Sequence, residues 1–163
     1  MIHEADPDDR DVLVGLAFYS AMDEDWSKAL EYAKAYLKRD GRQNAARLSL
    51  GLLEAETLYR LGRSEEAQTS LEAYVNRTRD PWYRAVSEAL QGKRPEDSLK
   101  LESGKTPENL LVLQTALGFW SEGSGNNEKA IKHYKVAMES FMTTRVEFDF
   151  ARERLKKLRK ALN

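Results

Sequence analysis

The sequence predicts an all-α fold in which helical hairpins stack into a right-handed solenoid that ends in a capping helix. Three observations predict it. Apolar residues recur at helical spacing along almost the whole chain, and no alternating strand pattern persists beyond a few residues. Cap and turn residues divide this pattern into segments joined by short connectors, which makes neighbouring helices antiparallel. A short motif also recurs at corresponding helix positions.

The expected helices follow the cap and turn residues in order. They cover residues 10–22, 25–38, 43–61, 64–77, 81–91, 95–102, 107–122, 126–141 and 144–161. Side-chain oxygens that can accept a hydrogen bond from the first helical turn stand at Asp25, Ser64 and Asn126. Thr106 followed by Pro107 places a cap and a preset φ angle at the start of another helix. Glycines mark the places where helices have to stop and turn, at Gly41, Gly62, Gly92 and Gly125.

The last expected helix carries one apolar stripe on an otherwise charged surface. The stripe consists of Phe148, Ala151, Leu155, Leu158 and Leu162. The remaining positions are mostly basic or acidic, among them Arg152, Glu153, Arg154 and Lys156. We expect this charged side to face solvent, as the terminal helix of a repeat array does. The alternative is a binding site for an acidic partner.

Three segments share a small alanine that is followed by a bulky residue further round the same helix face. Their marker alanines are Ala29, Ala67 and Ala130. The third copy is the most complete, with Leu117-Gly118 on the preceding helix and Tyr134 and Ala137 on the next. This pattern resembles the tetratricopeptide repeat, a helical hairpin of about 34 residues. The resemblance implies a solenoid that acts as a protein-interaction scaffold or adaptor.

The resemblance divides the chain into the units of one domain, residues 1–163. The units are repeats at about 10–41 and 44–78, a degenerate hairpin at 81–103, a repeat at 107–142 and a capping helix at 144–161. The half from about 82 to 158 also resembles the closing repeats of bacterial tetratricopeptide lipoproteins that serve as adaptors.

The N-terminal region indicates a neighbour on its outer side. The acidic, proline-containing stretch 6–9 resembles a junction between repeats, and the helix over 12–22 is apolar nearly all round. We therefore expect the chain to be the C-terminal part of a longer array, or to self-associate through this helix.

Composition and motifs argue against several function classes. The 26 basic and 27 acidic side chains nearly cancel, which argues against a dedicated nucleic-acid binder. The chain has no cysteine, and no phosphate-binding loop, zinc-binding helix or serine elbow occurs. We therefore expect no enzyme activity, no cofactor and no metal, and we interpret His133 as ordinary repeat surface. The longest apolar stretch, 12–22, is too short to insert into a membrane, and the sequence does not separate a cytoplasmic from a periplasmic location.

Repeat proteins of this kind bind partners on the concave face that their first helices line. The residues expected there are Val14, Phe18, Leu52, Glu56, Tyr59, Thr115, Phe119 and Glu122. They predict a partner peptide or helix with aromatic or apolar anchors and positive charge. Phe119 fits either this groove or the core. The alternatives to partner binding are self-association within a larger protein and, with less support, a helical-repeat RNA binder.

Glu54 stands where the repeat usually has leucine. Either its helix is displaced, with the carboxylate at the surface or paired with an arginine, or Glu54 is a buried carboxylate at a binding site.

Overall fold

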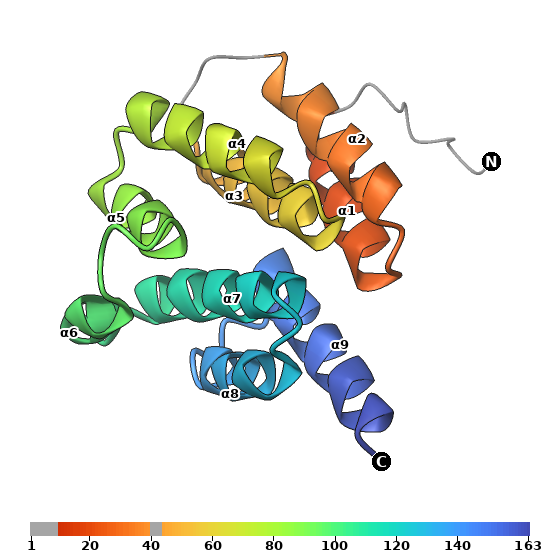
Figure 1. Ribbon diagram of the computed structural model, residues 1–163, viewed down its shortest axis with the longest axis vertical. Helices are drawn as coiled ribbons and strands as arrows, with labels where there is room; N and C mark the ends of the chain where they lie inside the picture. Colours follow the sequence, from red (N-terminus) through yellow and green to blue (C-terminus); the bar gives the residue numbers. More distant parts are fainter. Residues whose placement is uncertain (1–9, 40–43) are drawn as a thin grey trace.

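The computed structural model describes residues 10–39 and 44–163, and every regular element in these ranges is a helix (Figure 1). The elements are α1 (Arg10–Met22), α2 (Trp26–Leu37), α3 (Ala45–Arg60), α4 (Ser64–Arg77), α5 (Pro81–Leu90), η1 (Glu96–Leu99), α6 (Lys100–Ser103), α7 (Pro107–Gly123), α8 (Asn127–Met138) and α9 (Val146–Ala161). The helices pack in neighbouring pairs, α1 with α2, α3 with α4 and α7 with α8. The predicted all-α class is confirmed.

Local sequence signals set most helix ends. Side-chain oxygens cap α2, α7 and α8 at the expected residues, Asp25, Thr106 and Asn126. The expected cap at Ser64 is wrong, because Ser64 is the first helical residue and Arg63 takes the cap position without a side-chain cap bond. Arg63 instead forms an ion pair with Glu66 at 2.6 Å. The glycines that end helices with a positive φ angle are Gly62, Gly92 and Gly125, whereas Gly41 lies outside the described residues.

Four helices that are far apart in sequence form one inner layer, α1, α3, α7 and α9. Helix α7 packs on α3, and α9 packs on both α7 and α1, so that the last helix meets the first. Helix α5 packs on α4 and α7 at the side of this layer (Figure 1). The apolar helix α1 is therefore covered by α2 on one side and by α9 on another.

Phe150 of α9 lies at the centre of the core, among other aromatic rings. Phe150 is 1% exposed, and its ring centroid lies 5.0 Å from Phe119 and 6.0 Å from Phe18. The single apolar stripe expected for α9 describes only part of its buried side, because Phe150 and Arg154 are buried as well. Leu162, the last residue of that stripe, is exposed instead.

Small residues of the repeat motif lie where neighbouring helices pack closely. Ala67 and Ala130 are fully buried, as expected for residues where two helices approach each other. At Gly118 a β-carbon would come within 2.5 Å of the Tyr134 ring, so glycine is required for α7 and α8 to pack at this distance.

Within the described ranges, no helix is long and apolar enough to cross a membrane.

Candidate functional site

The eight residues predicted to line a concave groove do lie on the inner helices α1, α3 and α7, but these helices do not surround an open groove. The buried ones are Phe18, Leu52, Glu56, Thr115, Phe119 and Glu122, whereas Val14 and Tyr59 are partly buried. The face that they share is closed by α9 and by the direct packing of α7 on α3. Binding of a partner at these residues stays a prediction, and it requires α9 or α7 to move.

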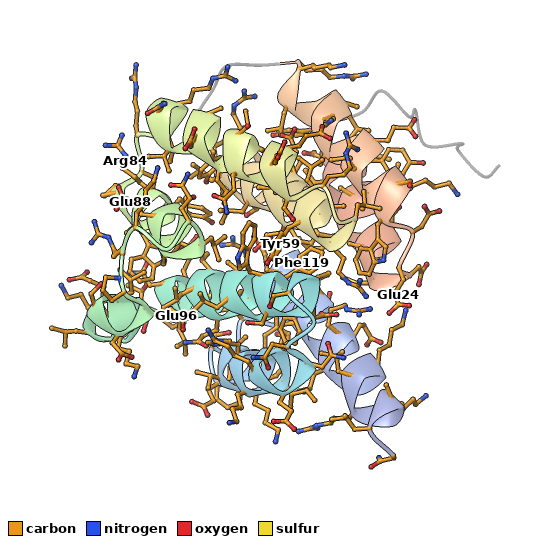
Figure 2. All side chains as sticks on the ribbon, viewed as in Figure 1. Glu24, Tyr59, Arg84, Glu88, Glu96 and Phe119 are labelled. Atoms are coloured by element: carbon orange, nitrogen blue, oxygen red, sulfur yellow. The ribbon has the colours of Figure 1, made fainter. Side chains whose placement is uncertain are left out.

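Phe119 lies in the core, which decides between its two interpretations. Its ring packs against Trp26 at 5.5 Å and against Phe150 at 5.0 Å between centroids, and the side chain is 1% exposed. Tyr59 stacks on Trp120 at 4.1 Å and keeps part of its surface exposed. Figure 2 labels Tyr59 on α3 and Phe119 on α7, near the place where these two helices pack together.

Glu122 forms an ion pair with an arginine of its own chain. The Arg154 guanidinium donates to Glu122 Oε2 at 2.6 Å and to Oε1 at 3.0 Å, and the Tyr134 hydroxyl donates to Oε1 at 2.7 Å. Arg154 also forms an ion pair with Glu24 at 2.7 Å. With Phe150 and Arg154, α9 therefore supplies to the inner layer the aromatic anchor and the positive charge that were expected of a partner.

A small cavity of about 30 Å³ lies where α5 meets the inner helices α1, α3, α7 and α9. Glu56 and Thr115 line it, and each has a buried oxygen without a hydrogen-bond partner among the described residues. The Ser49 hydroxyl, which also lines it, donates to Glu147 across the layer. A cavity of this volume holds one or two water molecules, which could satisfy these oxygens.

We expect Glu56 to make stability depend on pH. Burial raises the pKa of the Glu56 carboxyl well above its ordinary value, so the folded chain keeps this proton to higher pH than the unfolded chain. The free energy of unfolding therefore falls as pH rises from about 4.3 towards the raised pKa. Glu56→Gln keeps the size and removes the titration, and its stability advantage over the wild type should grow with pH.

Urea midpoints measured between pH 4.5 and pH 8 check this prediction. Glu128→Gln, which changes an exposed carboxyl on α8, is the matched control and should follow the wild type. A constant difference between Glu56→Gln and the wild type over this range would contradict the burial of an unpaired Glu56.

An open groove of about 740 Å³ lies on the outer side of the fold, between α2 and α4 and over α3. We call it the outer groove. Its apolar lining comes from Leu37, Leu48, Gly51, Leu58, Ala73 and Tyr74. The Tyr74 ring lies across Gly51, where a β-carbon would come within 2.4 Å of it, and its hydroxyl donates to the Leu48 carbonyl at 2.9 Å. Glycine at position 51 therefore lets the Tyr74 ring pack directly on the α3 backbone, where the ring forms part of the groove lining.

The two ends of the outer groove carry opposite charges. Because α2 and α4 both run antiparallel to α3, their C-terminal turns and the first turn of α3 lie at one end, which carries Lys38, Arg47 and Arg77. The opposite end carries Glu65 and Glu66 at the start of α4. A bound segment with a charged residue at each end would therefore bind preferentially in one direction.

Glu54 lies between these ends and is partly buried. Burial raises the pKa of its carboxyl, while the positive charges of Lys34 and Arg77 act in the opposite direction. Glu54 lines the groove, and no hydrogen bond or ion pair to another described residue is formed by its carboxylate. Its unusual place in the repeat was the one sequence signal that pointed to this groove.

The other candidate groups show no reactive arrangement in the described ranges. These residues hold no cluster of three or more acidic, histidine or cysteine side chains that could bind a metal ion. His133 is partly buried, with its Nδ1 2.8 Å from Gln114 Oε1, and burial lowers the pKa of its imidazole.

Comparison of the chain with protein families, curated proteins and solved structures finds no match.

Proposed function

We propose that this chain is a protein-interaction scaffold of the tetratricopeptide type, and that it binds a helical segment of a partner in the outer groove. The observation that carries the proposal is an open groove of about 740 Å³ with an apolar floor, charged ends and a partly buried carboxylate. The inner layer, in contrast, is packed by side chains of the chain itself.

The shape of the outer groove favours a helix. The lining residues of α4 run from Glu65 to Arg77, a length of about 18 Å at the rise of an α-helix. The small side chains Ser70 and Ala73 on α4 leave room above α3. An amphipathic helix can lay its apolar side into such a groove and keep its polar side in water.

The charges of the groove specify the chemistry of this helix. A lysine or arginine in its middle would face the Glu54 carboxylate, on which the positive charges of Lys34 and Arg77 also act. An acidic residue would lie near Lys38 and Arg77, and a basic one near Glu65. The apolar positions would contact Leu48, Leu58 and Ala73, as in other grooves that bind helices.

A peptide selection tests this proposal. Peptides selected from a random helical library for binding to the chain should bind Ser70→Arg at least about tenfold more weakly, because the new side chain fills the groove. Gln68→Arg places the same side chain on the same helix outside the groove lining and should leave affinity unchanged. Fluorescence anisotropy measures both. Equal affinity for the wild type and Ser70→Arg would overturn the proposal.

Glu54→Gln tests the chemistry of the site separately. The variant keeps the side-chain size and removes the charge, so peptides with a central lysine or arginine should lose affinity and peptides without one should not. A uniform effect on all selected peptides would show that Glu54 does not recognise a cation.

A further inference from the structure

Phe141 combines an exposed aromatic side chain with an unfavourable backbone conformation. It lies between α8 and α9, has a φ angle of 51° and is 80% exposed. Residues with a β-carbon avoid this left-handed region, in which glycine is the usual choice. The turn is held by the bond from the Phe141 N–H to the Met138 carbonyl at 3.2 Å and the bond from the Thr143 N–H to the Phe141 carbonyl at 2.9 Å.

Glu24 has a similar backbone conformation, but its side chain has a role inside the fold. Glu24 is the other described non-glycine residue with a positive φ angle, 64°, and its carboxylate binds Arg154 on α9. The unfavourable backbone at Glu24 thus positions a side chain that the fold uses. Phe141 belongs to none of the buried clusters formed by the described residues, so its ring has no comparable role inside the chain.

We propose that Phe141 of one copy inserts into the outer groove of a second copy and joins the two head to tail. The inference rests on the proposed function, since it names a second copy of this chain as a partner of the same groove. The groove has an apolar floor at Leu48, Leu58 and Ala73 that can receive an aromatic ring.

Charge complementarity supports this occupant. Glu139 is exposed and lies two residues before Phe141, so it would approach the basic end of the groove when the ring is bound. Lys38 and Arg77 are exposed at that end.

Phe141 and the outer groove belong to different elements of the chain, so a contact between them can join two copies. Helix α8 packs on α7 and α9, whereas the groove is formed by α2, α3 and α4. A contact between two different surfaces of identical chains is heterologous, and it produces chains or rings instead of a closed pair.

Analytical ultracentrifugation over a range of concentrations tests the role of Phe141. The wild type should gain mass with concentration, whereas Phe141→Gly should stay monomeric and be at least as stable to heat, because glycine fits the left-handed backbone. Leu101→Ser, which removes another side chain that is 80% exposed, should associate like the wild type. A wild type that stays monomeric at all concentrations, or a Phe141→Gly variant that associates equally, would overturn the inference.

Tyr19→Ser distinguishes a contact through α1. Tyr19 is 57% exposed on that helix, and its replacement should leave association unchanged. Association that is lost in Tyr19→Ser and kept in Phe141→Gly would overturn the inference and place the contact on α1.

Mixing two variants tests the contact itself. Phe141→Gly lacks the ring and Ser70→Arg has a blocked groove, so each should be monomeric alone. In a mixture, the ring of the Ser70→Arg copy can enter the open groove of the Phe141→Gly copy, and the product should be a dimer that does not grow. A mixture that stays monomeric while the wild type associates would overturn the inference. If selected peptides still bind the groove in that case, the proposed function stands without self-association.

Discussion

Arg154→Met is expected to lower the free energy of unfolding by about 3–5 kcal/mol, because it leaves a buried carboxylate without its partner. Arg154 is 1% exposed and Glu122 is 3% exposed, so water cannot replace the lost interaction. Methionine fills the space of the arginine stem but not that of the guanidinium. The loss therefore reports on the guanidinium and its contacts with Glu122, Glu24 and the Trp26 ring, and urea unfolding monitored by circular dichroism measures it.

Two further variants isolate this effect. The double variant Arg154→Met with Glu122→Gln removes both charges and should recover a large part of the stability, since no uncompensated charge remains. Lys156→Met changes an exposed lysine on the same helix, whose ion pair with Glu153 is solvated, and should shift stability by less than about 1 kcal/mol. Equal effects of Arg154→Met and Lys156→Met would contradict the docking of α9 on the inner layer.

Phe119→Ala should cost about 3–5 kcal/mol of folding free energy, the range for removing a large aromatic side chain from a core. Phe119 packs between Trp26 and Phe150, which come from α2 and α9, so the cavity would lie where three helices meet. Because both neighbouring rings are held by other helices, we expect little collapse into the space.

Phe141→Ala is the matched control, because it removes the same side chain from an 80% exposed position. Its unfolding free energy, measured in dilute solution, should stay within about 0.5 kcal/mol of the wild type. If Phe119→Ala is equally mild and weakens peptide binding instead, Phe119 is a binding residue and its place in the core is wrong.

The helices could be predicted from the sequence because their signals are local. Asp25, Thr106 and Asn126 cap helices that begin within one residue of the expected positions. The error at Ser64 has a local cause as well, since Arg63 and Glu66 form an ion pair over the same helical turn. The expected helix over 95–102 is divided into η1 and α6.

The closed inner layer could not be predicted from these signals. It depends on contacts between α9 and α1, at opposite ends of the chain. The spacing of apolar residues does not indicate which distant helices pack together. Arg154 shows the consequence, since the pattern of charges on α9 places it with the solvated residues and the structure buries it against Glu122. Glu56 was likewise predicted to line a groove, and the structure buries it in a small cavity beside Thr115 of α7.

The outer groove was missed for a different reason. The repeat pattern predicts a partner on the first helix of each hairpin, whereas the groove is lined largely by the second helices, α2 and α4. Ser70 and Ala73 on α4 are too small to fill the space beside α2, and small residues on a helix surface carry little signal by themselves. Glu54 gave a usable signal because it departs from the repeat pattern.

The most direct test of the proposed binding surface is backbone hydrogen–deuterium exchange of the chain with and without a selected peptide. Binding in the outer groove should slow exchange in α2 and α4 and leave α1, α7 and α9 unchanged, because the inner layer stays closed. Slower exchange in α1 and α7 together with faster exchange in α9 would contradict this account, since it would show that the partner displaces α9 and binds the inner layer.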